Sequence, residues 1–164
     1  MRLRRRKPVV PDVQDDPQAA RLAALKLLNR RDYSARELAE RLVARGIESE
    51  TADAAIEQLI SEKLVDDARY AEHFVAYHAN RGRGPVGIAH KLREAGVSPE
   101  EIATALDLNS PEWRTRCAEV RRRRFGAKLP GTWIARGRQA RFLIQRGFSA
   151  AQVRAAVGQF PGED

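Results

Sequence analysis

Arginine supplies most of the chemistry that this sequence can offer. Between Trp113 and Arg146 there are 11 basic residues and one acid, Glu119. The run from Arg121 to Arg124 covers every face of a helix, so packing alone cannot account for all four side chains. Guanidinium groups bind phosphates or acidic protein surfaces with affinity but little sequence choice. We therefore predict a surface that binds DNA phosphates or an acidic protein, with a solvated basic face as the alternative; its residues are Arg121, Arg122, Arg123, Arg124, Arg136, Arg138 and Arg141.

A second candidate site is a short glycine-rich segment, in which Arg81 and Arg83 alternate with Gly82 and Gly84. Glycine allows a backbone to approach a partner closely, and successive exposed amides can bind an anion. We add Arg81 and Arg83 to the predicted binding surface. A plain turn between two helices is an equally good interpretation of these glycines.

Enzymatic chemistry is not indicated. His73 and His78 are five residues apart, which does not align two metal ligands on a helix. Asp66 and Asp67 are adjacent and better explained as a helix start than as a metal pair. The sequence has neither a Walker A motif nor a dinucleotide fingerprint, and Cys117 lies on an apolar helix side. We expect a protein that is not an enzyme and needs no cofactor or metal.

Composition indicates a folded protein of the cytoplasm. The chain has 164 residues, of which 43% are hydrophobic and 32% charged, and one cysteine. No apolar run is long enough to span a bilayer, and the basic N-terminus lacks the apolar stretch of a secretory signal. Charge is uneven: residues 1–7 hold five basic groups and no acid, residues 8–107 have a net charge of −5, and residues 108–164 have +8. A chain whose net charge is separated in this way is expected to bind a charged partner in a preferred orientation.

The elements that must position these arginines repeat with a period of about fifty residues. Gly46, Gly96 and Gly147 each follow a leucine by four positions and precede an apolar residue. Glycine at this place suits the left-handed residue that ends a helix. The next helix opens with a capping box at Ser98 and at Ser149. The first copy has Glu48 instead of serine, so we expect Ser49 to be its cap.

The pattern predicts an all-α fold of three tandem three-helix repeats that form an elongated, curved body. The expected parts are a flexible basic arm (1–15), repeat 1 (16–64), repeat 2 (65–108) and a basic repeat 3 (109–164). Tyr70, Phe74 and Tyr77 share one helical stripe, and we expect them in the core. We expect Trp113 and Trp133 in the core or between repeats.

Three segments resemble the RecX family. They are Leu25 to Leu38 (Leu-Lys-Leu-Leu-Asn-Arg-Arg-Asp-Tyr-Ser-Ala-Arg-Glu-Leu), Leu64-Val65-Asp66-Asp67-Ala68-Arg69-Tyr70-Ala71 with Phe74 following, and Arg81-Gly82-Arg83-Gly84-Pro85. The resemblance covers residues 20–107 strongly and the remainder through the repeat pattern and basic character. The Leu-Val-Asp-Asp-Ala-Arg-Tyr-Ala segment before a glycine-rich turn is rather specific.

The resemblance implies a regulator of the RecA recombinase. Proteins similar to this one bind along the groove of the RecA–single-stranded-DNA filament and mainly inhibit its growth. They thereby dampen ATP hydrolysis, strand exchange and the self-cleavage of the LexA repressor. The expected partners are the RecA filament and, weakly or within the filament, DNA; no membrane is expected, and the chain is expected to be a monomer.

The competing hypothesis is a stand-alone, sequence-independent nucleic-acid-binding protein whose helices only present arginines. A helix-turn-helix over residues 34–60 would be one form of it. That segment carries six acidic residues, which argues against its lying in a DNA groove. Repeat 1 is therefore expected to contact protein.

Overall fold

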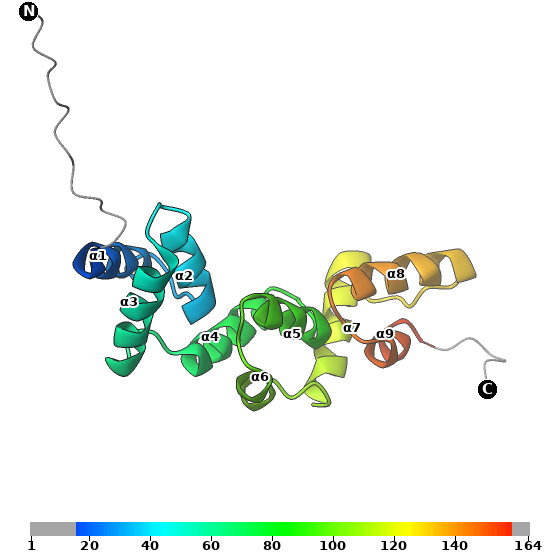
Figure 1. Ribbon diagram of the computed structural model, residues 1–164. Helices are drawn as coiled ribbons and strands as arrows, with labels where there is room; N and C mark the ends of the chain where they lie inside the picture. The colour runs from blue at the N-terminus through cyan, green and yellow to red at the C-terminus, as the bar shows by residue number, and fades with distance from the viewer. Residues whose placement is uncertain (1–15, 159–164) are drawn as a thin grey trace, which may run out of the picture. The chain divides into compact units, whose positions relative to one another are not determined.

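The computed structural model describes residues 16–158, and within this range the chain forms nine helices and no strand (Figure 1). The predicted basic arm, residues 1–15, lies outside the described residues. Two compact units divide the chain at Asp66. Unit 1 contains α1 (Pro17–Leu28), α2 (Ala35–Val43) and α3 (Ser49–Ser61). Unit 2 contains α4 (Asp67–Asn80), α5 (Pro85–Glu94), α6 (Pro99–Ala105), α7 (Glu112–Phe125), α8 (Trp133–Gln145) and α9 (Ala150–Val157).

The three predicted glycine stops are confirmed. Gly46, Gly96 and Gly147 have φ angles of 88°, 81° and 92°. In each copy the amide of the residue after the glycine donates to the carbonyl of the leucine five positions earlier. The N···O distances are 3.2 Å in the first copy, 3.1 Å in the second and 3.3 Å in the third. This is the Schellman pattern, which satisfies carbonyls that a helix end would leave without partners.

Two of the three expected helix starts are also confirmed. Ser98 and Ser149 each form a reciprocal capping box, with Glu101 and Gln152 respectively. The prediction for the first copy is wrong: Glu48 occupies the N-cap position without a side-chain cap, and Ser49 is the first helical residue. The repeat geometry thus sets the start of α3 even where the residue type that normally fixes it is missing.

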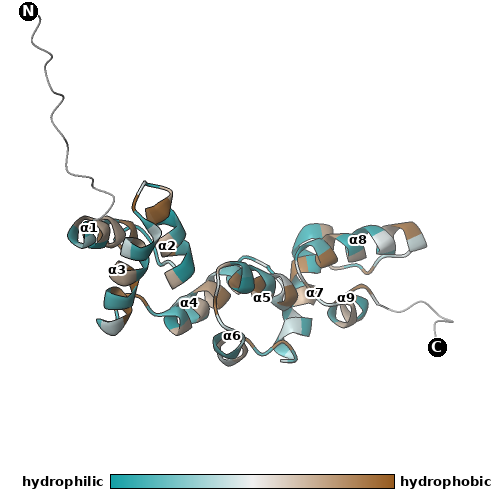
Figure 2. Cartoon of the chain, viewed as in Figure 1, coloured by the Kyte–Doolittle hydropathy of each residue, from teal (hydrophilic) through white to brown (hydrophobic). Residues whose placement is uncertain are grey.

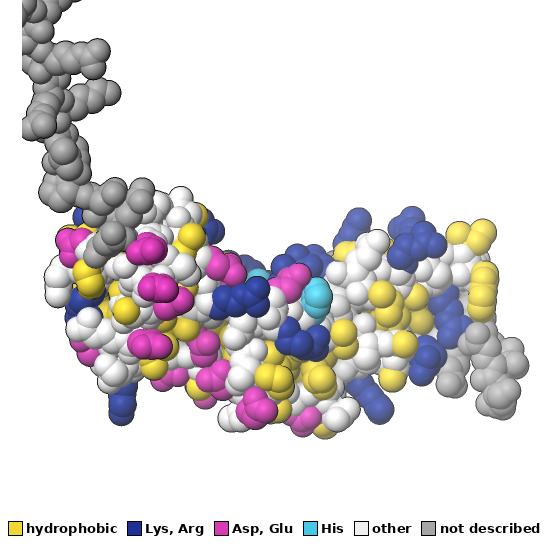
Figure 3. Space-filling model, viewed as in Figure 1, with side chains coloured by type: hydrophobic (Ala, Val, Ile, Leu, Met, Phe, Trp, Pro, Cys, Tyr) yellow, Lys and Arg dark blue, Asp and Glu magenta, His cyan; other side chains and the backbone are white. Residues whose placement is uncertain are grey.

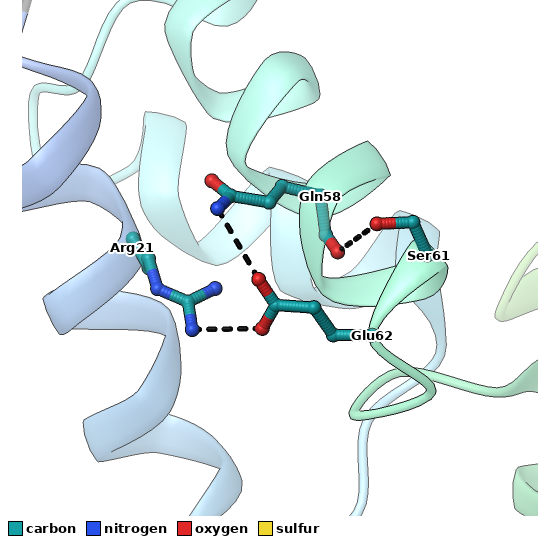
Figure 4. Close-up of polar contacts among 4 residues, drawn as sticks. All are labelled: Arg21, Gln58, Ser61 and Glu62. Atoms are coloured by element: carbon teal, nitrogen blue, oxygen red, sulfur yellow. Dashed lines mark hydrogen bonds and ion pairs between the residues drawn. The ribbon is translucent and has the colours of Figure 1, made fainter.

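Unit 1 is a three-helix bundle around its own core, in which Leu38, Leu42 and Leu59 are fully buried. An ion pair of 2.7 Å joins Arg21 on α1 to Glu62 after α3 (Figure 4). The amide of Gln58 donates to the other oxygen of the same carboxylate. These contacts tie the end of α3 to α1.

Unit 2 combines six helices on one continuous core that includes Ile88, Leu92, Trp113, Leu143 and Phe148. Hydrophobic and hydrophilic residues alternate along its helices, as expected of amphipathic helices that bury one face (Figure 2). The second and third repeats therefore share one hydrophobic core.

The aromatic residues follow the prediction only in part. Tyr70 and Trp113 are buried and Phe74 packs against the core, as expected. Tyr77 is 54% exposed because it lies near the end of α4, where the guanidinium of Arg81 covers its ring at 3.7 Å instead of core residues. Trp133 is 69% exposed since α8 begins with it, directly after an exposed turn. The expectation of core packing is wrong for these two residues.

Candidate binding site in unit 2

Two adjacent hollows on unit 2 bring together most of the exposed arginines that the sequence singled out. The first hollow, about 310 Å³, lies between the α4–α5 turn, α7 and α8. Its lining consists of Asn80, Arg81, Gly82, Val120, Arg123, Arg124, Phe142 and Arg146. The second hollow, about 440 Å³, shares Arg124 and Phe142 with the first and adds Phe125, Arg138, Arg141 and Gln145. We call the six arginines of the two hollows the basic face: Arg81, Arg123, Arg124, Arg138, Arg141 and Arg146.

Aromatic rings hold several of these arginines in place. Phe125 and Phe142 meet edge to face, with 5.3 Å between their ring centroids. The guanidinium of Arg124 lies 5.4 Å and that of Arg138 5.7 Å from the centroid of Phe125, and Arg146 lies 5.4 Å from that of Phe142. Cation–π contacts restrict a guanidinium without neutralising it. The arginines keep their charge for an anionic ligand.

The first hollow joins two repeats. Arg81 comes from the turn after α4, and Arg146 from the end of α8. The guanidinium of Arg146 donates to the carbonyl of Arg81 over 3.5 Å. The pKa of nearby His78 is lowered from its usual 6.5, first by burial and then by the charges of Arg83, Lys91 and Arg81. Positive charge from the α4–α5 turn and from α5 therefore reaches the imidazole of His78.

The glycine-rich turn matches the second of its two interpretations, a turn between two helices. The amides of Gly82 and Arg83 donate to carbonyls of α4, at Ala79 and His78, and the amide of Gly84 donates to the carbonyl of Arg146 over 2.8 Å. The prediction that successive exposed amides bind an anion here is therefore wrong, because all three amides are used within the protein.

Glycine is required at this turn for contact between repeats 2 and 3. The amide of Gly87 donates to the carbonyl of Gly147 over 3.1 Å. A Cβ atom on Gly84 would stand 2.4 Å from backbone atoms of Gly147 and Phe148, and one on Gly147 would stand 2.7 Å from the Cα of Gly87. This glycine joint (Gly84, Gly87 and Gly147) lets two backbones touch and thereby brings the walls of the first hollow together.

Four predicted residues lie outside the hollows. Arg121 is buried; its guanidinium donates to the carbonyls of Lys128 and Ala127, over 3.1 and 3.3 Å, and holds the loop after α7. Arg136 is buried in α8. Arg122 and Arg83 are exposed and line neither hollow. The run of four arginines thus combines one structural residue with three exposed ones.

Sequence reasoning did not include Arg146 among the predicted binding residues. A usable signal was present, because Phe142 precedes Arg146 by four positions and Tyr77 precedes Arg81 by four. Residues four apart are neighbours on a helix face, so an aromatic residue at this spacing can carry a guanidinium.

No group of three or more His, Cys, Asp or Glu side chains within residues 16–158 could hold a metal ion. Cys117 is fully buried, and burial raises the pKa of its thiol to about 12, so the reactive thiolate does not form near neutral pH.

Three domain descriptions of one family match the chain in order. The first three-helix domain of RecX matches residues 20–59, the second matches residues 66–106 and the third matches residues 113–157. The chain belongs to the RecX family. The family is one of regulatory proteins, and the all-helical architecture of three three-helix domains is the one predicted from the sequence.

Close relatives cover nearly the whole chain. The regulatory protein RecX of Halorhodospira halophila is 43% identical over 90% of this chain and 91% of its own length. The RecX protein of Pseudomonas savastanoi pv. phaseolicola is 36% identical over 94% of this chain and its full length. The crystal structure of RecX from Lactobacillus salivarius has the same fold, with a TM-score of 0.71 at 21% identity; it covers 87% of this chain and 95% of the solved one.

The family match identifies the class of protein, and the two hollows show which surface of unit 2 is basic. Figure 3 shows Asp and Glu side chains gathered over α1–α3, and Lys and Arg side chains over α7–α9.

No helix within residues 16–158 is both long and apolar enough to cross a bilayer.

Proposed function

We propose that this RecX-family chain binds the RecA–single-stranded-DNA filament and mainly inhibits its growth. It would thereby reduce ATP hydrolysis, strand exchange and the filament-dependent cleavage of LexA. The observation that carries the proposal beyond family membership is the basic face, in which exposed arginines from α7, α8 and the α4–α5 turn converge on two hollows. The chain acts by binding and not by catalysis.

The mechanism is electrostatic and steric. Arginines on the basic face would contact DNA phosphates or acidic filament surfaces without sequence choice. Cation–π contacts with Phe125, Phe142 and Tyr77 hold four of these guanidinium groups near their binding positions, which reduces the entropy lost on contact. A helical body placed on the filament would block addition of further RecA protomers.

A second candidate function is sequence-independent binding of free single-stranded DNA. The specific observation in its favour is the combination of arginines with partly exposed aromatic rings, which is typical of surfaces that bind single strands. The two functions differ in whether RecA must be present for the chain to act.

The test uses two variants of equal charge change in the full chain. Arg123→Glu with Arg124→Glu reverses two charges inside the hollows, while Arg114→Glu with Arg122→Glu reverses two exposed charges of α7 outside them. We expect the first variant to need at least about tenfold more protein for half-inhibition of RecA, since it loses contacts worth about 1.5–3 kcal/mol each. The control should change by less than about threefold.

Equal effects of the two variants would show that only net charge matters and that the hollows are not the contact. A hollow variant that loses free-DNA binding but inhibits RecA fully would separate the basic face from regulation. Loss of DNA binding in a protein that never affected RecA would favour the second candidate function.

A further inference from the structure

Helix α8 buries one face and exposes the other. Gln139 and Leu143 are buried on its inner face. Trp133, Ile134 and Ile144 are 69%, 84% and 49% exposed, although burial stabilises bulky apolar side chains. Trp133 and Ile144 are separated by about three helical turns, so both lie on one side of the helix. Bulky apolar groups gathered in this way mark a surface that contacts a partner.

A glycine lies in the middle of the exposed face. Among the described residues, no atom lies within 4 Å of a Cβ atom placed on Gly137, so packing does not require glycine there. Gly137 is an interior residue of α8 without a positive φ, so the backbone does not require it either. Glycine inside a helix lowers stability relative to alanine. Since Trp133, Gly137 and Arg141 follow at i, i+4 and i+8, the glycine opens the helix backbone to close approach by a partner between the indole and the guanidinium.

The same face is positively charged. Arg138 and Arg141 are exposed on it and also line the second hollow, so it continues into the basic face. Residues 120–162 contain ten basic residues and no acid. Figure 3 shows hydrophobic side chains exposed beside Lys and Arg side chains at the end of α8. A fitting partner therefore combines negative charge with flat apolar surface. We call this surface the α8 face: Trp133, Ile134, Gly137, Arg138, Arg141 and Ile144.

We infer that the α8 face binds the bases of single-stranded DNA, with Trp133 as the stacking residue. Every nucleotide supplies both a phosphate and a flat ring, so one strand satisfies the guanidinium groups and the indole together. Arg138 and Arg141 would contact phosphates, and Gly137 would admit the sugar–phosphate backbone. The inference deepens the proposed function: it rests on the DNA contact proposed there and names the residue that contacts the bases.

The start of α8 holds Trp133 in place. The hydroxyl of Thr132 accepts a hydrogen bond from the amide of Ala135 over 3.2 Å and caps the helix. The loop before Thr132 is held by Arg121, whose guanidinium donates to two of its carbonyls. An indole has only two side-chain torsions, so stacking on a fixed backbone costs little conformational entropy.

The test compares two probes of equal length: oligothymidylate, and an abasic oligomer that carries the same phosphates without bases. Affinities of the full chain are measured by fluorescence anisotropy at low salt, without RecA. The wild type should bind oligothymidylate at least about tenfold more tightly, because only that probe can stack. Trp133→Ala should bring the two affinities within about twofold of each other, whereas Trp133→Phe keeps a ring and should keep most of the preference.

Two further variants separate stacking from general damage to the fold. Leu108→Ala changes a 42% exposed leucine before α7 that lines neither hollow, and it should keep the wild-type preference. Gly137→Ala should raise the urea midpoint, since alanine favours a helix, and yet weaken oligothymidylate binding at least about threefold. A glycine with a merely structural role would not combine greater stability with weaker binding.

Tryptophan fluorescence identifies the stacking residue directly. Trp133 is exposed and Trp113 is buried, so a stacked base reaches only Trp133. Oligothymidylate should quench the emission of the wild type, the abasic oligomer should not, and Trp133→Phe should remove the quenching.

Equal affinity of the wild type for the two probes would overturn the inference. A preference that survives Trp133→Ala would do the same, because the bases would then lie elsewhere. If Trp133→Ala weakens inhibition of RecA but alters neither preference nor quenching, the α8 face contacts protein instead. A chain that inhibits RecA without preferring bases contradicts only this inference, and one that prefers bases without affecting RecA contradicts only the proposed function.

Discussion

Arg121 and Arg122 are consecutive residues of α7 that differ in their exposure to solvent. Arg121 is buried with its guanidinium on two loop carbonyls, while Arg122 is exposed. We expect Arg121→Ala to lower the free energy of unfolding by about 2 kcal/mol or more, since it loses charge-assisted hydrogen bonds. Arg122→Ala should stay within about 0.5 kcal/mol of the wild type. Urea unfolding of both variants makes the comparison; equal losses would contradict the structural role of Arg121.

His78 reports on the charge of the turn that carries Arg81 and Arg83. Its pKa is lowered in the folded chain, so the unfolded chain takes up a proton first as pH falls. The stability that depends on neutral His78 is therefore present above the usual pKa of 6.5 and is lost as pH falls below it.

Bound phosphates should change this titration. A single strand on the first hollow would offset the charge of Arg81, one of the charges that lower the pKa of His78, and we expect that pKa to rise part of the way toward its ordinary value. An NMR titration of the His78 imidazole with and without oligonucleotide measures the change. A pKa of His78 that stays the same under saturating oligonucleotide would place the strand elsewhere.

At the scale of helices, most of the fold could be predicted because its signals are local. A glycine stop and a serine cap act within a few residues, so Gly96 and Ser98 were sufficient to end one helix and begin the next. The same reasoning gave the wrong cap for α3, because that helix begins after Glu48 without a side-chain cap. Burial of Tyr77 was mispredicted because a helical stripe does not reveal where the covering helix ends.

The glycine joint could not be predicted from local sequence patterns. Gly84 and Gly87 touch Gly147, about sixty residues further along the chain, and no spacing rule links them. The same limit applies to the candidate binding site. The run of arginines predicted a basic surface. The side chain of Arg121 is buried because its guanidinium donates to carbonyls of the loop after α7, and no local pattern predicts that contact.

The joint predicts a contrast between two glycines of unit 2. Gly126 and Gly147 both have positive φ, 90° and 92°, but a Cβ on Gly126 meets nothing within 4 Å. Gly126 has φ 90° and ψ 176°, a conformation essentially restricted to glycine, so Gly126→Ala should cost about 1–3 kcal/mol of unfolding free energy for the backbone alone. Gly147→Ala should cost about 1–3 kcal/mol more, because its Cβ meets the backbone of Gly87.

Only Gly147→Ala should also weaken binding of single-stranded DNA, since it moves the walls of the first hollow apart. Denaturant unfolding and oligonucleotide binding of the two variants provide the measurements. Equal unfolding costs would contradict the close packing of repeats 2 and 3.

At the scale of the whole molecule, function rests on the difference between its two units. Unit 1 presents an acidic α3 with an apolar groove, and unit 2 presents the basic face. A single domain of one charge could bind DNA alone, whereas a chain with both surfaces can contact protein and nucleic acid together. This combination is what the proposed regulation of a nucleoprotein filament requires.

The measurement that tests this account most directly is the ATPase rate of RecA on single-stranded DNA at rising, substoichiometric amounts of the full chain. We predict a dose-dependent fall at amounts too small to coat the DNA, reduced by Arg123→Glu with Arg124→Glu and kept by Arg114→Glu with Arg122→Glu. An unchanged ATPase rate at every dose, under conditions where the chain binds single-stranded DNA directly, would contradict filament regulation.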